Sequence, residues 1–445
     1  MNEDWREPMR RALASARGRV GRAPLVVRSG RVVRAVGLSI ESLGPRVAVG
    51  EEVRLETASG KLISMAEVVG FNGANVHSMP VDPVRGLRHE DRVVATGRRP
   101  RIPVGDALLG RVLDADGRPL DGLGPIRSRA LRSIHAEPVP AFSRPTISQP
   151  MTTGVRTIDG LLTLGRGQRI GIFSGPGVGK SRLLGSIARY ASDERIVISL
   201  VGERNREVRE FVEGALGEGL KRSVVFVATS DESALRRVRC ALAATTAAEE
   251  FRRQGHNVTL LMDSLTRVAM ALREIGLSAG EPPSTKGYTP SVFAFLPRLL
   301  ERAGCEETGG ALTGIYTVFV EGDDLTDPVA DAARAILDGH IVLARSLAER
   351  AHYPAIDALA SVSRVMPAVT SREHMQAAMR ARRLMAIYRD AEDLVAIGAY
   401  RQGMDPELDL AVARHQAIDE FLRQDLTQPS PLEETVRRLA ELGAA

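Results

Sequence analysis

The chain has 445 residues, a length that corresponds to two to four domains at roughly 100–200 residues each. Its apolar fraction of 44% and charged fraction of 26% exclude disordered, collagen-like and mucin-like proteins. The longest uncharged apolar stretch, residues 308–320, is too short for a membrane span of ~18–20 residues, and no secretory signal opens the chain. Two cysteines, Cys240 and Cys305, are too few for a disulfide framework or a zinc site, so we expect a cytoplasmic protein.

The net charge of +5 and a pI near 9.5 permit a nucleic-acid or membrane partner, but the surplus is small for this length. The 60 basic residues include only the lysines 61, 180, 221 and 286, and heavy use of arginine is typical of a biased genome composition. We therefore expect a solvated basic surface without a nucleic-acid partner. The scarcity of lysine makes the position of Lys180 informative.

The first 22 residues predict an amphipathic helix, because Trp5, Met9, Leu13 and Val20 recur at helical spacing among arginines. Such a helix either packs on its own domain or docks a partner. Residues 23–98 then contain short Val-rich segments at 31–40, 52–57, 61–71, 75–79 and 92–95, separated by turn signals. Five or six short strands in this span predict a small closed β-barrel.

From residue 99 to 371 the pattern changes to strands that alternate with helices. We expect strands at 169–173, 195–201, 223–228, 258–263 and 311–320, and helices at 180–191, 207–216 and 232–253. This alternation predicts an α/β domain with a mostly parallel sheet. Residues 372–445 are helical in pattern throughout and predict a C-terminal helical domain.

The strand at 169–173 leads into the sequence Ser-Gly-Pro-Gly-Val-Gly-Lys-Ser at 174–181 and then a helix, which is the setting of a phosphate-binding P-loop. Lys180 would neutralise the β- and γ-phosphates, and the Ser181 hydroxyl would hold Mg²⁺. Ser174 occupies a slot that usually holds glycine, and a small residue there is compatible with binding. The loop residues expected around the phosphates are Gly175, Pro176, Gly177, Val178 and Gly179.

Two further strands end in carboxylates. Asp263 closes an apolar strand and would orient Mg²⁺ and its waters. Glu203 follows the strand at 195–201, where the carboxyl ends of parallel strands meet, so it can face the γ-phosphate and orient the attacking water. The adjacent Arg204 would contact phosphate. Taken alone, a Gly-Glu-Arg segment such as 202–204 is more often a helix start with solvated charges.

Four runs carry a resemblance to a known family: 201–211, 289–304, 321–345 and 354–364. They are similar to the export ATPases of bacterial type III secretion, which are relatives of the rotary ATP synthase subunits. The resemblance spans about residues 25–430 and implies a RecA-like P-loop core between the β-barrel and the helical domain. It implies ATP and Mg²⁺ as substrate and cofactor.

The resemblance also implies roles for individual residues. Lys180 and Ser181 match the phosphate and Mg²⁺ ligands, Asp263 the Mg²⁺-orienting acid, and Glu203 the catalytic glutamate. Arg204 matches a γ-phosphate contact, Tyr353 an aromatic ring that stacks on adenine, and Arg364 an arginine that reaches a neighbouring subunit's nucleotide. Because one chain carries both Glu203 and Arg364, a homohexamer can build a complete site at each interface.

Partners follow from the resemblance as well. The N-terminal helix matches the segment that binds a peripheral stalk regulator. The acidic turn at 403–409 resembles one that faces a central stalk protein and the membrane export gate, although an ordinary helix cap explains its acids equally well. Export chaperone–cargo complexes would be the substrates of transport. The protein would lie at the cytoplasmic face of the inner membrane.

Several alternatives remain open. The segment 101–122 favours a flagellar over a virulence-type (injectisome) system. A proton-translocating ATP synthase subunit is disfavoured by the runs at 289–304 and 321–345. A hexameric nucleic-acid translocase is disfavoured because Phe71 is the lone aromatic residue between Arg31 and Thr96, too few to stack bases. An inactive ring subunit is disfavoured by the joint presence of Lys180, Glu203 and Arg364.

Overall fold

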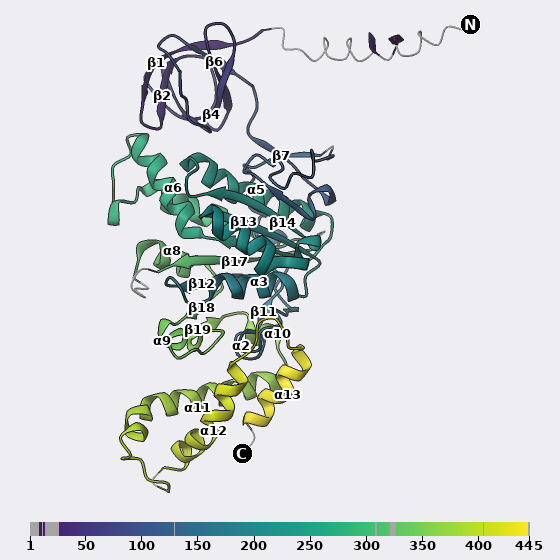
Figure 1. The fold of residues 1–445 in the computed structure, drawn as a ribbon, viewed down its shortest axis with the longest axis vertical. Helices are drawn as coiled ribbons and strands as arrows, with labels where there is room; N and C mark the ends of the chain where they lie inside the picture. The colour runs from purple at the N-terminus through teal and green to yellow at the C-terminus, as the bar shows by residue number, and fades with distance from the viewer. Residues whose placement is uncertain are drawn as a thin grey trace, which may run out of the picture. The chain divides into compact units, whose positions relative to one another are not determined.

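The computed structural model describes residues 9–10, 12–13, 26–128, 130–307, 309–320, 326–403 and 405–443, and Figure 1 shows its ribbon. Two compact units divide the chain, Met1–Arg98 and Arg99–Ala445. The docking helix expected over residues 1–22 lies outside the described residues, apart from 9–10 and 12–13. In the described part, no helix combines the length and the hydropathy that crossing a bilayer requires.

The first unit is a closed barrel of six antiparallel strands in the order β1-β2-β5-β4-β3-β6, as the sequence predicted. The strands are β1 (Ser29–Val36), β2 (Ser39–Leu43), β3 (Glu52–Glu56), β4 (Leu62–Asn72), β5 (Asn75–Pro80) and β6 (Arg92–Ala95). Alternate residues such as Val53 and Leu55 point into the barrel and are buried. One expectation was wrong: residues 31–40 are not one strand, because Gly37, at φ 58°, turns the chain between β1 and β2.

The second unit is built on a nine-stranded sheet in the order β19-β18-β12-β17-β15-β13-β14-β8, with β16 on β17. All pairs are parallel except those of β19 with β18 and β16 with β17. The strands are β8 (Arg111–Leu113), β12 (Arg169–Ser174), β13 (Arg195–Glu203), β14 (Ser223–Thr229), β15 (Val258–Asp263), β16 (Gly304–Cys305), β17 (Ala311–Phe319), β18 (Gly339–Leu343) and β19 (Ile356–Ser363). The sequence analysis did not anticipate β8, β16, β18 or β19.

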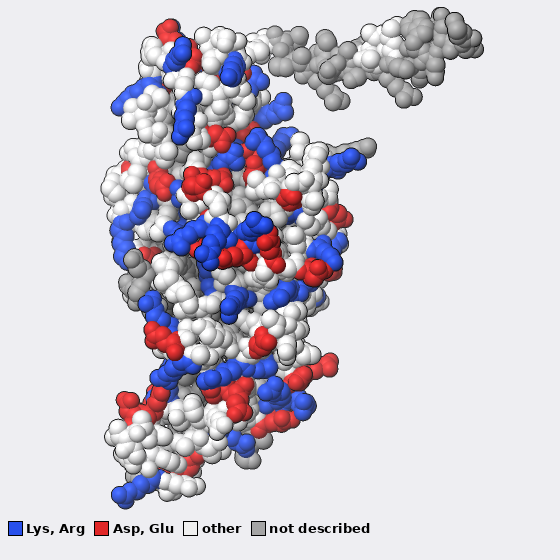
Figure 2. Space-filling view, viewed as in Figure 1, with Lys and Arg blue, Asp and Glu red and all other residues white. Residues whose placement is uncertain are grey.

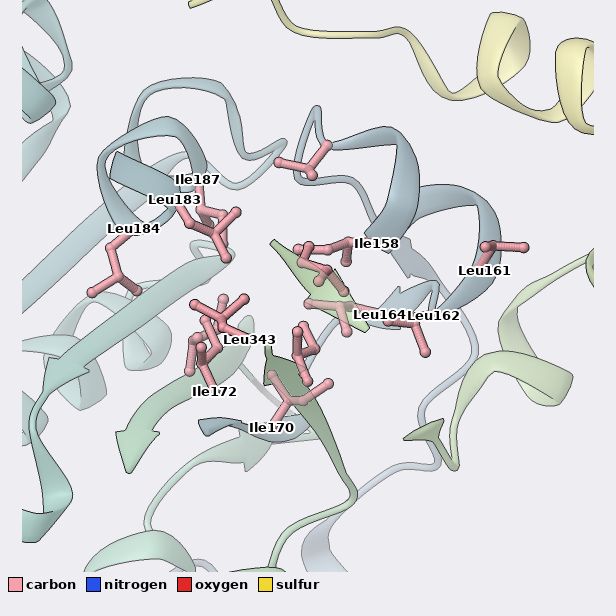
Figure 3. Close-up of a cluster of buried hydrophobic side chains, with 14 of the residues drawn as sticks. Ile158, Leu161, Leu162, Leu164, Ile170, Ile172, Leu183, Leu184, Ile187 and Leu343 are labelled. Carbon is pink, nitrogen blue, oxygen red and sulfur yellow. The ribbon is translucent and has the colours of Figure 1, made fainter. Parts of the chain in front are cut away.

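Helices cover both faces of this sheet (Figure 1). Helix α3 (Lys180–Tyr190) covers one face, and α5 (Ala234–Arg253) and α6 (Leu265–Ser278) cover the other. Figure 3 shows Leu183 and Ile187 of α3 close to Ile172 of β12, within the largest buried apolar cluster. The remaining elements of the core are α2 (Arg156–Leu161), α4 (Asn205–Glu210), a π-helical turn (Phe211–Leu216), α7 (Pro290–Leu300), α8 (Pro328–Ile336), α9 (Arg345–Glu349), α10 (Met366–Val369) and the short pairs β7 (Arg101–Pro103) with β9 (Leu131–Ser133) and β10 (Pro150–Met151) with β11 (Leu164–Gly165).

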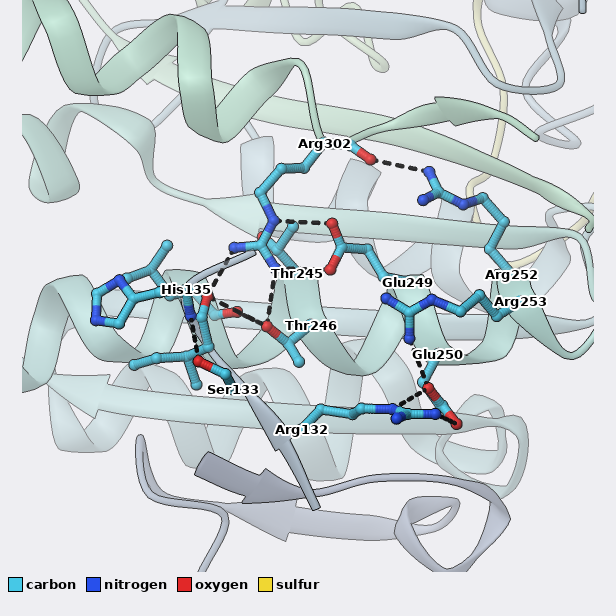
Figure 4. A network of polar contacts seen from close by, with 12 residues as sticks. Arg132, Ser133, His135, Thr245, Thr246, Glu249, Glu250, Arg252, Arg253 and Arg302 are labelled. Atoms are coloured by element: carbon cyan, nitrogen blue, oxygen red, sulfur yellow. Dashed lines mark hydrogen bonds and ion pairs between the residues drawn. The ribbon is translucent and has the colours of Figure 1, made fainter. Parts of the chain in front are cut away.

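A buried ionic network holds the segment after β9 against α5 (Figure 4). Arg302 is almost fully buried and forms two hydrogen bonds to the Glu249 carboxylate, from Nε at 2.8 Å and from Nη2 at 2.7 Å. It also donates to the Ile134 carbonyl at 2.9 Å and to Thr246 Oγ1 at 2.8 Å. Both buried charges therefore form more than one hydrogen bond, as low-dielectric surroundings require.

The C-terminal part is helical, as predicted, and consists of α11 (Arg372–Ala396), α12 (Pro406–Leu422) and α13 (Leu432–Gly443). Helices α11 and α12 pack on each other, and Phe421 and Leu422 belong to the same buried cluster as the core strands. These helices are thus continuous with the core of the second unit.

Candidate nucleotide site

The P-loop connects β12 to α3, in the predicted strand–loop–helix setting. Gly179 has φ 90°, a left-handed conformation that suits glycine, and it caps α3 immediately before Lys180. Ser174 is the last residue of β12, opposite Phe319 of β17 and Leu343 of β18, and its carbonyl accepts a hydrogen bond from Val320 N–H. The serine in the unusual slot is therefore a buried residue of the sheet.

Three charged side chains from three elements meet above this loop. Lys180 Nζ donates a hydrogen bond to Asp263 Oδ1 at 2.6 Å and lies 3.7 Å from Glu203 Oε1. Thr317 Oγ1, on the neighbouring strand β17, donates to the same Asp263 oxygen at 2.6 Å. Strand order explains the meeting, because β12, β17, β15 and β13 are adjacent and parallel, so their carboxyl ends lie at one edge.

The electrostatics of the site follow from this crowding. Burial raises the pKa of Glu203 to about 7, and the nearby Asp263 carboxylate adds to the effect while Lys180 opposes it. Burial disfavours the charge of Lys180, but Asp263 and Glu203 outweigh it, so the pKa of Lys180 is raised. Glu203 is thus a carboxyl group that titrates near neutrality, a property common among catalytic acids and bases.

Arg267 is a member of this site that the sequence analysis missed. It lies in the first turn of α6, three residues after the Ser264 cap, and lines the same cavity as Lys180 and Glu203. Its side chain crosses Gly202, where an added Cβ would lie 3.1 Å from Arg267 Cβ and Cγ. The one available signal was its position four residues after Asp263, at the edge where the parallel strands end.

The cavity at this edge has a volume of about 570 Å³. A second cavity of about 660 Å³ adjoins it, and it is lined in part by Val178, Phe211, Pro354 and Leu426. Tyr353, 41% exposed, lines both, and a Cβ on Gly179 would lie 3.5 Å from its ring. One cavity is therefore polar and P-loop-lined, and the other offers apolar side chains beside an aromatic ring.

The remaining predicted residues lie farther out. The side chain of Arg204 is 81% exposed at the rim, where it pairs with Glu207 at 3.2 Å. Arg364 follows β19, and β19 runs antiparallel to β18, with Gly339 opposite Ser363 and Leu343 opposite Ile356. Leu343 stands beside Ser174 at the P-loop edge, so Arg364 is at the opposite edge of the sheet. The chain brings Lys180, Glu203 and Asp263 together and keeps its own Arg364 away.

The donor set suits Mg²⁺ bound to a nucleotide. Ser181 offers a hydroxyl beside Lys180, and Asp263 offers a carboxylate, while phosphates and waters supply the remaining oxygens that Mg²⁺ prefers. Among the described residues, no group of three or more His, Cys, Asp or Glu side chains could hold a metal without such help.

Comparison with known proteins identifies the family. Residues 154–363 match the nucleotide-binding domain of the ATP synthase alpha/beta family, and residues 370–441 match the T3SS EscN ATPase C-terminal domain. The chain is 51% identical to a flagellum-specific ATP synthase of Pseudomonas aeruginosa, over 93% of this chain and 92% of the relative. The chain belongs to the family of type III export ATPases.

This export ATPase also resembles an injectisome enzyme. It is 48% identical to a type 3 secretion system ATPase of Sinorhizobium fredii, over 98% of the chain and 96% of the relative. The structure of the assembled ATPase EscN from the enteropathogenic E. coli type III secretion system matches it with a TM-score of 0.88 and 45% identity, over 93% of this chain and all of that chain. The ATPase is therefore an ATP hydrolase of the flagellar or injectisome class, with the predicted barrel, P-loop core and C-terminal helices.

Proposed function

We propose that the cavity at the P-loop binds Mg-ATP and hydrolyses it by direct attack of a water that Glu203 orients. The observation that carries this proposal is that three charged side chains meet at the carboxyl edge of the sheet. Lys180 Nζ lies 2.6 Å from Asp263 Oδ1 and 3.7 Å from Glu203 Oε1. The water oxygen bonds to the γ-phosphorus, the bond to the bridging oxygen breaks, and Glu203 accepts the water proton. ADP and phosphate leave without a covalent enzyme intermediate.

The cations around the cavity have distinct roles in this proposal. Lys180 neutralises the β- and γ-phosphates, and the loop of Gly175, Pro176, Gly177, Val178 and Gly179 surrounds them with backbone N–H groups. Arg204 and Arg267 contact the γ-phosphate from the rim. Ser181 and Asp263 would hold Mg²⁺, which neutralises phosphate charge when it is bound. Tyr353 stacks on adenine in the adjoining cavity.

Arg364 would act in the site of a second copy of the chain. Its place at the opposite edge of the sheet supports this role, because it leaves this arginine free of its own P-loop. An arginine that reaches the transferring phosphoryl group from a neighbouring subunit is worth roughly 10³–10⁵ in rate. We therefore propose a homohexamer with one complete site at each interface, and the assembled state of the related EscN supports it.

The C-terminal helices would face a central stalk protein and the export gate, and the relative EscN has been solved in complex with its central stalk EscO. The acids of the turn at 405–409 have internal partners. Asp405 accepts hydrogen bonds from the Glu407 and Leu408 N–H groups, and Glu407 accepts two from Arg383, at 2.6 and 2.8 Å. Asp409 accepts from Tyr400 Oη at 2.6 Å and from Gly403 N–H at 2.8 Å. These bonds order the tip of the helical domain, so the proposed stalk contact would use the shape of the tip together with its acids.

The proposed biological work is the release of export cargo from chaperones, its unfolding, and its delivery to the membrane gate. We propose that the system is flagellar and that the ATPase lies at the cytoplasmic face of the inner membrane, with a peripheral stalk regulator on its N-terminal helix. Restored swimming of a Pseudomonas aeruginosa strain lacking its flagellar relative would support this assignment. Restored injectisome secretion without swimming, in a strain lacking its secretion ATPase, would instead assign the virulence-type system.

The proposed function does not include a nucleic-acid partner. Figure 2 shows basic and acidic side chains interspersed over the face in view, with no continuous basic stripe. Exposed arginines of α4 are paired in sequence with glutamates, such as Arg206 with Glu210 at 2.7 Å and Arg209 with Glu213 at 2.8 Å.

The test is the rate of ATP hydrolysis per chain against protein concentration, with and without single-stranded RNA. We expect a rate that climbs steeply with concentration, ignores RNA, and vanishes in Glu203→Ala while ATP binding persists. Glu213→Gln, which changes an exposed glutamate outside both cavities, is the matched control and should keep the wild-type rate. Stimulation by RNA would favour a translocase, and unchanged turnover in Glu203→Ala would overturn the catalytic assignment.

A further inference from the structure

The loop that carries Tyr353 is tied to the C-terminal helices at two points. The side chain of the preceding residue, His352, bonds through Nδ1 to Oδ1 of Asp419 in α12, at 2.9 Å. The carbonyl of Tyr353 itself accepts a hydrogen bond from the backbone N–H of Gln424, two residues after α12 ends, also at 2.9 Å. The aromatic ring beside the P-loop is thus placed by a helix that is distant in sequence.

The first of these ties is well defined. His352 is 3% exposed, and burial lowers its pKa although Asp419 opposes the effect. The imidazole is therefore neutral near pH 7, and its Nδ1 must carry the proton that the Asp419 carboxylate accepts. Asp419 has one further partner, Arg423, whose Nε lies 2.7 Å from Oδ2 at the surface. The two carboxylate oxygens thus serve different neighbours.

The chain before Tyr353 has little freedom to move independently. Helix α9 ends with hydrogen bonds from Ala351 N–H to the Ala348 carbonyl at 3.0 Å and from His352 N–H to the Leu347 carbonyl at 2.9 Å. Ala351 has φ 53°, a left-handed conformation that an alanine adopts only when its surroundings impose it. This turn therefore constrains the backbone that leads into Tyr353.

The second tie ends on an equally fixed group. The Gln424 side chain donates to the carbonyls of Gly154 and Gln428, each at 2.8 Å, and accepts from Arg156 N–H at 2.8 Å. All of its polar atoms are engaged within the protein, so this glutamine is a structural anchor beside the cavity. Replacing Gln424 would therefore disturb the segment after α12. The His352–Asp419 hydrogen bond is the contact that a substitution can remove while that segment keeps its own hydrogen bonds.

We propose that His352 and Asp419 are positioning residues for base binding: their hydrogen bond holds the Tyr353 ring in place over the nucleotide. The inference rests on the proposed function, in which Tyr353 contacts the adenine. Neither residue lines the two cavities at the P-loop, and the contacts among Lys180, Asp263 and Glu203 at the phosphate end do not involve them. Removing this hydrogen bond should therefore lower the affinity for the base and leave the affinity for the phosphates unchanged.

Two competitive inhibitors separate these effects, because ADP carries the base and pyrophosphate does not. The experiment measures the inhibition constants of Mg-ADP and Mg-pyrophosphate, with kcat and KM for ATP, in the full-length enzyme. In His352→Ala and Asp419→Ala we expect the inhibition constant of ADP and the KM for ATP to rise about three- to tenfold, the range expected for one aromatic stacking contact. The inhibition constant of pyrophosphate and kcat should stay at the wild-type values.

A conservative variant and two control variants distinguish loss of the His352–Asp419 hydrogen bond from a general effect on the fold. His352→Asn keeps an N–H donor near the place of Nδ1 and should restore most of the ADP affinity. Arg423→Gln removes the other partner of Asp419 without touching His352 and should behave as wild type. Glu392→Gln breaks the exposed Arg350–Glu392 pair, 3.0 Å long, which joins the same two parts of the fold, and should also behave as wild type.

The outcomes also separate this inference from the proposed function. Tyr353→Ala that leaves the ADP constant unchanged would refute the adenine contact itself. A raised ADP constant in Tyr353→Ala, with wild-type constants in His352→Ala and Asp419→Ala, would refute the positioning role alone. Parallel loss of ADP and pyrophosphate binding, or no rescue by His352→Asn, would mean a general structural role and would overturn the inference. If His352→Ala does not fold, Asp419→Ala, at a half-exposed position, makes the same test.

Discussion

Tyr353 and Arg364 lie at opposite ends of strand β19 (Ile356–Ser363) and therefore at opposite edges of the sheet. The strand starts beside the P-loop edge, where Leu343 of β18 pairs with both Ile356 and Ser174, and it ends opposite Gly339. Ile356 and Ser363 pair with Leu343 and Gly339, which are four steps apart on β18, so at ~3.3 Å per residue the two ends of β19 are roughly 13 Å apart. Tyr353, before this antiparallel strand, thus lines the nucleotide cavity of its own chain, whereas Arg364, after the strand, lies at the other edge of the sheet.

Mixing two inactive variants tests the position of Arg364. Alone, Arg364→Ala should lose roughly 10³–10⁵ in kcat, because no cation stabilises the phosphoryl group, while each chain still binds ATP. Mixed with Glu203→Ala, it should regain turnover, since some interfaces then combine an intact Glu203 with a neighbour's intact Arg364. The measurement is the ATPase rate of the mixture against the sum of the separate rates. A mixture that stays inactive would place Arg364 in the site of its own chain.

The raised pKa of Glu203 predicts a pH dependence. Its carboxyl group has a pKa of about 7, mainly because it is buried, with Asp263 adding to the shift. The protonated form cannot accept a proton from water, so kcat/KM, which reports the free enzyme, should rise with pH through about 7 and then level off. Initial rates at low ATP between pH 5.5 and 8.5 measure this profile.

Circular dichroism over the same pH range is the control for folding. A kcat/KM that is flat down to pH 5.5 in a folded enzyme would show that Glu203 is already ionised there, against this prediction.

The buried pair of Arg302 and Glu249 should dominate the stability of its region. Arg302→Met leaves Glu249 as a buried carboxylate without its cation, which costs about 3–5 kcal/mol in the free energy of unfolding. The double variant Arg302→Met/Glu249→Leu removes the stranded charge and should lose less. Urea unfolding followed by circular dichroism measures both. Arg209→Met, which breaks an exposed pair with Glu213, is the control and should unfold near the wild-type midpoint.

If the double variant is as unstable as Arg302→Met or less stable, the loss comes from packing and from the Arg302 hydrogen bonds to the Ile134 carbonyl and Thr246. The charge argument for this network would then fail.

The turn after α9 predicts a stabilising substitution. Ala351 has φ 53° at the position after the helix where glycine is preferred, since a Cβ is strained there. Ala351→Gly should therefore stabilise the protein by ~1 kcal/mol, visible as a higher urea midpoint. Ala58→Gly, in a turn where the alanine does not have a positive φ, is a control that should not stabilise. A lower midpoint for Ala351→Gly would mean that the alanine side chain contributes more by contact than its backbone costs.

The parts of the site that sequence could predict each have a local signal in the chain. The P-loop is one such segment, because a strand, a glycine-rich turn and a helix start at Lys180 carry its chemistry within a dozen residues. Asp263 and Glu203 were predictable because parallel strands end at one edge. The barrel was predictable from short Val-rich segments separated by turn signals, although the turn at Gly37 was missed because a single glycine is a weak signal among strand-forming residues.

What sequence alone determined is thus the local chemistry: a phosphate loop, two acids at strand ends and a barrel before them. Only the tertiary structure decided that Arg267 lines the phosphate cavity, that His352 meets Asp419 across 67 residues of chain, and that Arg364 stands at the far edge of the sheet. These relationships depend on strand order, strand direction and helix packing. They are set by buried contacts between distant segments, and such contacts leave no periodic or contiguous pattern in the chain.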